Sequence, residues 1–179
     1  IFASNGILFN HESPLRGLEF VTRKVTNAVA EIKLGLRKNL ILGNTSSIRD
    51  WGFAKEYVEA MWKILQLDSS DDFVVATGEA HSVKELVEYS FNRVGLDHNE
   101  FVKSDDRFKR PIDVNFLLGD IKKLHDLTGW KPKTKFKELI NLMVDADLKR
   151  WSDYLDGKLF PWDALNYPNN LDFITRNKK

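Results

Sequence analysis

The chain has 179 residues, enough for one domain, and its 27 Lys and Arg against 26 Asp and Glu give a net charge of +1. This near balance offers no broad basic surface for nucleic acid or an anionic membrane, so we expect neither as a partner. The absence of cysteine excludes disulfides, thiol catalysis and Cys-ligated metals and fits a reducing compartment. No apolar run approaches the roughly 20 residues that span a bilayer.

Strand and helix signals alternate along the chain, which predicts an α/β fold. Residues 7–9 read as the end of a buried strand, with residues 10–16 as a loop at its carboxyl end, where ligands of open α/β sheets bind. An apolar stripe over residues 20–32 predicts a helix that ends before Gly35, and residues 40–42 predict a short strand.

A polar turn after that strand leads to an arginine and then to a helix. Residues 44–47 supply hydrogen-bond donors, Arg49 supplies a planar fork of N–H groups, and apolar residues at helical spacing over 54–65 predict a helix whose positive dipole end is nearby. This layout predicts an anion site. The alternative is an ordinary polar loop in which Arg49 pairs with Asp50 or Glu56.

The second half of the chain continues the alternation. Ser82 and Glu85 form the signature of a capping box, which opens a helix that Gly95 ends. The other predicted elements are a buried strand at residues 73–76, a charged loop at 96–109, a short helix at 121–128 and an amphipathic helix at 136–151. Residues 152–179 lose the helical pattern but keep aromatic residues, which predicts an extended tail packed on a neighbour.

Five motifs resemble the later half of the GDP-mannose 4,6-dehydratases, which are extended short-chain dehydrogenases/reductases. They are Asn10-His11-Glu12-Ser13-Pro14, Phe20-Val21-Thr22-Arg23-Lys24, Arg49-Asp50-Trp51-Gly52, Ala76-Thr77-Gly78-Glu79 with His81-Ser82-Val83, and Arg110-Pro111 through Phe116-Leu117-Leu118-Gly119-Asp120. They fall in the family's order and at similar spacing, from about residue 7 to 151. The resemblance implies that residues 1–151 are the substrate-binding part of a Rossmann-like fold, with strands that complete its sheet, and that the N-terminal cofactor-binding part is absent.

Two features of the family are missing. No two of the ten glycines are spaced as Gly-x-Gly, so nothing cradles the cofactor phosphates at a helix N-terminus. The family's catalytic pair is a tyrosine with a lysine four residues later, before the substrate-side motifs. Tyr154 and Lys158 have this spacing, but Gly157 interrupts it, Pro161 follows, and the pair comes after those motifs. We therefore predict no catalytic residue here.

The resemblance also implies a set of substrate contacts. The implied ligands of GDP-mannose are Asn10, Val21, Lys24, Leu42, Gly43, Asn44, Arg49, Arg110 and Asp113. Asn10 would take the sugar-proximal phosphate, and Arg49 and Arg110 would take the pyrophosphate through charge-assisted bonds of roughly 1.5 to 3 kcal/mol each. Asp113 would accept from the ribose hydroxyls, where the family has a longer glutamate. The alternatives are a solvated Lys24 and an exposed Arg110.

His11 and Arg16 match family positions that touch the nicotinamide cofactor from the substrate side, so NADP is the implied cofactor. Leu15 stands where the family more often has a basic residue. Without the surrounding motif, His11 would more often be a loop histidine with a structural hydrogen bond. The other three histidines are widely spaced, so we predict no metal site.

The resemblance implies a lyase that uses NADP to convert GDP-mannose to GDP-4-keto-6-deoxymannose and water, a reaction of GDP-fucose biosynthesis. We expect a cytoplasmic protein that is a homo-oligomer when complete, and a chain that is inactive alone because the catalytic pair is missing. Two alternatives remain: a non-catalytic nucleotide-sugar binding module, and a related GDP-sugar reductase or epimerase.

Overall fold

The structure is a computed structural model that describes residues 1–105, 107 and 114–158 of the chain. In chain order its elements are β1 (Asn5–Leu8), β2 (Asn10–Glu12), α1 (Val21–Lys33), β3 (Leu40–Leu42), β4 (Ile48–Arg49), β5 (Trp51–Phe53), α2 (Ala54–Ile64), β6 (Asp72–Val75), β7 (His81–Ser82), α3 (Val83–Arg93), α4 (His98–Phe101), β8 (Val102–Ser104), α5 (Lys122–Thr128) and α6 (Phe136–Leu155). The predicted α/β class is confirmed.

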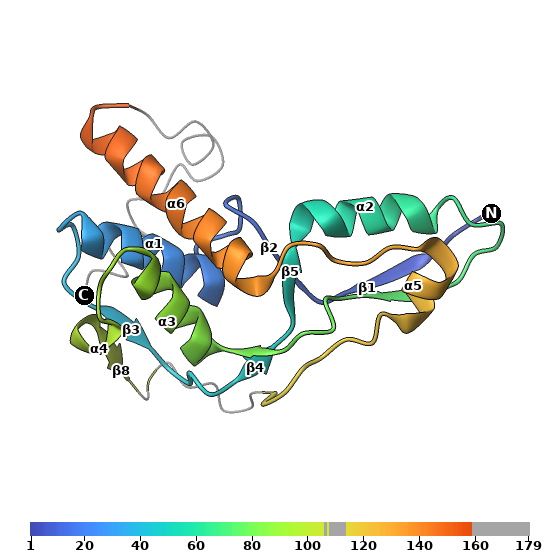
Figure 1. The fold of residues 1–179 in the computed structure, drawn as a ribbon, viewed down its shortest axis with the longest axis horizontal. Coiled ribbons are helices and arrows are strands. Elements are labelled where there is room, and N and C mark those ends of the chain that lie inside the picture. The colour runs from blue at the N-terminus through green and yellow to red at the C-terminus, as the bar shows by residue number, and fades with distance from the viewer. Residues whose placement is uncertain (106, 108–113, 159–179) are drawn as a thin grey trace.

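The elements form an elongated molecule with two groups (Figure 1). At one end, β1, β6, α2 and α5 lie together, and at the other α1, α3 and α6 lie beside β3 and β8. The short strand pairs β2 with β5 and β4 with β7 lie between them. Each group has its own apolar core.

The smaller core lies between α2 and the parallel pair of β1 and β6. Tyr57, Ala60 and Ile64 of α2 pack with Phe73 and Val75 of β6. The predicted helix is confirmed, but four residues of its apolar stripe are exposed: Val58, Met61, Trp62 and Leu65. These four residues are called the outer α2 face below.

Strand β1 is where predicted, but the prediction that it is buried is wrong. Ile7 is 54% exposed, and within the described residues β1 pairs along one edge only, with β6. Parallel strands are normally covered on both faces. Strand β1 therefore leaves an exposed Ile7 and an unpaired edge in the described residues, and the outer α2 face is likewise open to solvent.

The larger core holds the elements that position the site. Helix α1 runs over the predicted residues, and its buried face, including Val25, Ala28 and Val29, meets α3 and α6. The capping box of α3 is confirmed: Glu85 N–H donates to Ser82 Oγ at 3.1 Å, and Ser82 N–H donates to Glu85 Oε2 at 2.7 Å.

Three boundaries differ from the sequence prediction. The expected loop at residues 96–109 contains α4 and β8, because the Asp97 side chain caps α4 and β8 pairs in parallel with β3, a distant contact that local sequence does not encode. The expected loop at residues 10–16 begins as β2, which pairs with β5. Helix α6 continues past the predicted end at residue 151 to Leu155. Most of the predicted tail, residues 159–179, lies outside the described residues.

Candidate functional site

A cavity of about 370 Å³ opens between β2, the start of α1 and the turn that follows β3. Its lining consists of Asn10, Glu12, Arg16, Glu19, Phe20, Val21, Thr22, Lys24, Leu42, Gly43, Asn44, Ser47, Arg49, Trp51 and Val83. The volume falls within the range of roughly 300 to 1,000 Å³ that is typical of small-molecule sites. Seven of the nine residues predicted to bind substrate line this one cavity, together with Arg16.

Strand pairing brings these segments together. Asn10 of β2 lies opposite Trp51 of β5, so the first motif lies beside the third. Asn10 Nδ2 donates to the Asp50 carbonyl oxygen at 3.3 Å, which fixes the side-chain amide of Asn10 where β2 pairs with β5. Leu42 and Gly43 reach the cavity at the carboxyl end of β3, the edge at which parallel strands present ligand-binding loops.

The polar turn after β3 is shaped by its own side chains. Asn44 Oδ1 accepts from the Ser46 backbone N–H at 2.9 Å and from Ser46 Oγ at 2.7 Å. Asn44 Nδ2 donates to Ser47 Oγ at 2.9 Å. This is the local bonding by which asparagine stabilises turns. The hydrogen-bonding capacity that the sequence suggested for a ligand is therefore used partly to hold the turn.

Arg49 lies in β4, antiparallel to β7, and its Nη1 donates to the Ile48 carbonyl oxygen at 2.8 Å. Asp50 and Glu56, the alternative partners proposed for Arg49, accept hydrogen bonds from backbone N–H groups of other segments. Asp50 accepts from Thr77 N–H at 2.8 Å, among other backbone groups, and Glu56 accepts from Thr134 N–H at 3.0 Å.

The helix N-terminus at the cavity is that of α1, whereas the sequence predicted that of the helix at residues 54–65. Residues of α2 are not among those lining the cavity, because β5 separates Arg49 from that helix. The first turn of α1 lies there instead, with Val21, Thr22 and Lys24 in the lining. Burial lowers the pKa of Lys24, and the nearby Arg37 lowers it further. The positive end of the α1 dipole and this lysine both favour an anion in the cavity.

The main lining residue that sequence reasoning left without a role is Glu12, although it lies inside the first motif. Its side chain is 2% exposed and accepts from Thr22 Oγ1 at 2.5 Å. Burial raises the pKa of Glu12, while the hydrogen bond from Thr22 and the charge of Arg16 oppose that rise. Arg16 Nε lies 3.3 Å from Glu12 Oε2, and the Arg16 guanidinium carbon lies 3.4 Å from the centre of the Phe20 ring. Arg16 is thus held between a carboxylate and an aromatic face.

His11 is not among the cavity residues, and it makes the structural hydrogen bond that was the alternative for it. Its Nδ1 lies 2.9 Å from the Phe9 carbonyl oxygen, which can only accept, so Nδ1 carries the proton. The ring stacks on Tyr57.

Two predicted substrate residues, Arg110 and Asp113, lie outside the described residues. The chain is described again from residue 114, and Asn115 lies beside the site because its carbonyl oxygen accepts from Ile48 N–H at 2.8 Å. Within the described part of the chain, no three carboxylate or histidine groups are arranged to hold a metal ion. No helix there has the length and apolarity to cross a membrane.

Tyr154 and Lys158, the pair with catalytic spacing, lie far along the chain from the cavity residues and have structural contacts. Tyr154 packs edge-on against Trp151 with ring centroids 5.6 Å apart. Lys158 Nζ donates to Asp153 at 2.8 Å, and Gly157 has a φ of +81° just after the helix ends. Neither residue lines the cavity.

Comparison with known proteins gives matches along most of the chain. A family model described as GDP-mannose 4,6 dehydratase matches residues 1–143. GDP-mannose 4,6 dehydratase 1 of Arabidopsis thaliana is 54% identical over 149 residues, covering 83% of this chain and 41% of that protein. The Homo sapiens GDP-mannose 4,6 dehydratase is 48% identical over 166 residues, covering 83% of this chain and 45% of that protein. The chain thus spans about half the length of these relatives.

Solved structures share the fold. RMD from Pseudomonas aeruginosa, complexed with NADPH, superposes with a TM-score of 0.72 at 22% identity over 81% of this chain and 47% of that chain. A putative epimerase from Burkholderia cenocepacia gives 0.70 at 26% identity over 80% and 46%. The fold is therefore that of part of an extended short-chain dehydrogenase/reductase, and the family match and the identities show that this chain belongs to the GDP-mannose 4,6-dehydratase family.

Proposed function

We propose that this chain is the substrate-binding part of a GDP-mannose 4,6-dehydratase and that GDP-mannose binds in the cavity. The observation that carries the proposal is the convergence of three separate segments, at residues 10, 21–24 and 42–49, on that one cavity. These segments contain Asn10, Val21, Lys24, Leu42, Gly43, Asn44 and Arg49, the positions that the family resemblance assigns to substrate. The complete protein would form GDP-4-keto-6-deoxymannose and water, in the cytoplasm and as a homo-oligomer.

The charges of the cavity suit a nucleotide diphosphate. Arg49 and Lys24 enter it from β4 and from the first turn of α1. A pyrophosphate between them would be bound by charge-assisted hydrogen bonds, which are stronger than neutral ones. Arg110 and Asp113 remain part of the proposal. They lie five and two residues before Asn115, whose carbonyl oxygen accepts from the N–H of Ile48, the residue next to Arg49.

NADP is the proposed cofactor, in contact with His11 and Arg16 from the substrate side. Arg16 offers a guanidinium at the cavity, and His11 offers a second polar ring nitrogen on a ring held by its bond to the Phe9 carbonyl oxygen, so both can hydrogen-bond a nucleotide cofactor. When bound, NADP would supply the temporary oxidation of the hexose C4 hydroxyl and return the hydride to C6. The residues of this chain would choose and orient the sugar nucleotide, while the catalytic tyrosine and lysine would come from outside residues 1–179.

The open apolar surfaces favour this reading over a binding module that works alone. Val58, Met61, Trp62 and Leu65 are each more than 40% exposed on one helix, and β1 offers a further strand edge. Large exposed apolar patches mark contacts with another part of a protein or with a partner. A cofactor-binding half that continues the sheet from β1 would cover both surfaces.

Isothermal calorimetry with GDP-mannose tests the proposed site. Arg49→Ala should weaken binding about tenfold or more, because a charge-assisted bond of roughly 1.5 to 3 kcal/mol is lost. Arg93→Ala is the matched control, since that arginine pairs with Asp145 on an exposed surface away from the cavity and should leave affinity unchanged. Equal affinity in wild type and Arg49→Ala would overturn the pyrophosphate assignment.

A further inference from the structure

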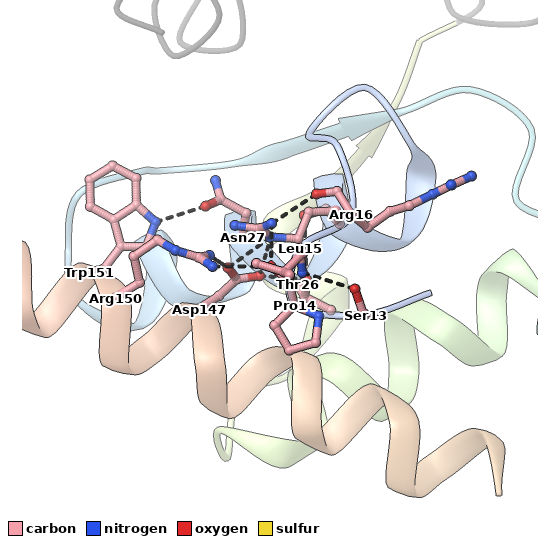
Figure 2. A network of polar contacts seen from close by, with 10 residues as sticks. Ser13, Pro14, Leu15, Arg16, Thr26, Asn27, Asp147, Arg150 and Trp151 are labelled. Carbon is pink, nitrogen blue, oxygen red and sulfur yellow. Dashed lines mark hydrogen bonds and ion pairs between the residues drawn. The ribbon is translucent and has the colours of Figure 1, made fainter. Parts of the chain in front are cut away.

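Behind the loop that follows β2, a buried ionic cluster joins α1 to α6 (Figure 2). It consists of Arg23, Asp147 and Arg150, which are 2%, 0% and 6% exposed and are called the clamp below. Arg23 Nε donates to both carboxylate oxygens of Asp147, at 2.9 and 3.0 Å, and Arg150 donates to the same carboxylate. Thr26 Oγ1 donates to it at 2.7 Å. None of these residues lines the cavity.

The clamp has two guanidinium groups for one carboxylate, and one further nitrogen of each guanidinium reaches the loop backbone. Arg23 Nη1 donates to the carbonyl oxygens of Pro14, at 2.7 Å, and Arg16, at 2.9 Å. Arg150 Nη2 donates to the Pro14 carbonyl oxygen at 3.1 Å. One carbonyl oxygen, that of Pro14, thus accepts from two cations on different helices.

A role in stability alone explains this arrangement poorly. Buried ion pairs cost desolvation and are weak evidence for net stabilisation, whereas satisfied buried polar groups specify one geometry. Trp151 Nε1 already ties α6 to α1 by donating to Asn27 Oδ1 at 2.9 Å. The clamp adds a connection from both helices to the loop.

The loop carries Arg16 into the cavity. Arg16 N–H donates to the Ser13 carbonyl oxygen at 3.0 Å, and Leu15 N–H donates to Ser13 Oγ at 3.1 Å, so residues 13–16 form a tight turn. Figure 2 shows the Arg16 side chain leaving this turn in the direction away from Arg150 and Trp151. The clamp therefore holds the backbone of the turn while the side chain faces Glu12, Phe20 and the cavity.

We propose that Arg23, Asp147 and Arg150 are positioning residues of the site: through the carbonyl groups of Pro14 and Arg16 they fix the turn that places the Arg16 guanidinium at the cavity. Helix α6 thereby sets the geometry of a site to which it contributes no lining residue. The effect on ligand binding rests on the proposed function, whereas the effect on the turn does not.

Amide hydrogen exchange on the unliganded chain tests the effect on the turn. Arg150→Met removes the charged donors but keeps an unbranched side chain. The Leu15 and Arg16 amides should exchange at least fivefold faster than in wild type, while buried amides of α1 keep their rates, and Arg150→Lys should restore part of the protection. Arg93→Met, which breaks the exposed pair of α3 with Asp145 of α6, is the control and should leave the turn unchanged. Unchanged exchange at Leu15 and Arg16, or an equal acceleration throughout α1, would overturn the proposal.

Arg16 is proposed to contact NADP, but it also lines the cavity proposed for GDP-mannose, so a double-mutant cycle with GDP-mannose tests whether the clamp acts through Arg16. Arg150→Met should weaken binding at least threefold in the wild-type background and less than 1.5-fold when Arg16 is already alanine. An equal loss of affinity for GDP-mannose in both backgrounds would mean a general structural role and would contradict this part of the inference. Absence of GDP-mannose binding by the wild-type chain would instead contradict the proposed function, and the exchange experiment would still decide the role of the clamp at the turn.

Discussion

The ring of His11 stacks on the ring of Tyr57, with centroids 5.5 Å apart and an angle of 30° between the planes. This contact joins β2, the strand that delivers the first motif, to α2, and Trp130 packs edge-on against Tyr57 with ring centroids 6.1 Å apart. Gly52, opposite His11 in the β2–β5 pair, leaves the space that the tyrosine fills. The position of His11 therefore depends on a helix that does not reach the cavity.

Gly52→Ala should destabilise the fold by about 1 to 3 kcal/mol, the usual cost of overpacking a filled core. An added Cβ would lie 2.3 Å from Tyr57 Cε2 and 2.7 Å from its hydroxyl oxygen, and both belong to a buried ring with little room to move. Urea unfolding followed by circular dichroism measures the change. Unfolding free energies within 0.5 kcal/mol of each other would show that the ring can shift.

Tyr57→Phe should leave stability unchanged or raise it by about 1 kcal/mol. The hydroxyl oxygen is buried and has no hydrogen-bond partner in the described part of the chain, and a buried unsatisfied polar group costs about 1 to 3 kcal/mol. The stacking on His11 needs only the ring. Thermal unfolding of the two proteins compares them directly, and a marked loss of stability in the phenylalanine variant would reveal a partner for the hydroxyl.

Glu12→Gln should change how stability depends on pH. Because burial raises the pKa of Glu12 in the folded state, the folded chain binds this proton more tightly than the unfolded chain, and wild-type stability falls as pH rises from the ordinary glutamate pKa through the raised one. Glutamine does not titrate, so its stability relative to wild type should grow over that pH range and then level off. Denaturant unfolding between pH 4 and 8 measures the difference.

A Glu12→Gln stability difference that stays flat over that pH range would contradict a raised pKa of Glu12 in the folded state.

Trp62→Arg should reduce binding of an apolar dye such as anilinonaphthalene sulfonate by about half or more. Trp62 is 62% exposed and belongs to the outer α2 face, where apolar side chains are contiguous along one helix. Tyr154→Arg makes the same change at an aromatic residue of similar exposure, 52%, on α6. Fluorescence titration should show a large drop for the first variant only, and equal drops would argue against a specific patch on α2.

The sequence predicted the elements whose signals are local. The capping box at Ser82 and Glu85 and the left-handed glycine after α5, Gly129 with φ +67°, both act within one helical turn, and both helices lie where expected. The pattern of α2 predicted the helix but not which of its apolar residues are covered. Periodicity identifies an apolar stripe, but it does not say which residues of the stripe pack on β6 and which stay exposed.

The site could be predicted only as a set of segments. The motif resemblance named Asn10, Lys24 and Arg49, but their meeting in one cavity depends on the pairing of β2 with β5 and on the packing of α1 beside β3. Glu12 had no role in the prediction, since burial between Thr22 and Arg16 is a tertiary property of a residue that otherwise resembles any loop glutamate. The same holds for the clamp, whose members belong to no recognised motif apart from Arg23.

The bond between Arg23 and Asp147 joins residues 124 positions apart in the chain. Closing a loop of this length costs conformational entropy. The Pro14 carbonyl oxygen obtains one charged donor from Arg23, nine positions away, and the other from Arg150, 136 positions away. A chain shortened before residue 147 would keep every residue named here as a ligand contact. It would lack the Asp147 carboxylate that orients Arg23, and Arg23 holds the turn that carries Arg16. The geometry of a turn near the cavity therefore depends on a carboxylate 124 positions beyond Arg23, so truncation of the distant helix reaches the site without removing any of its lining residues.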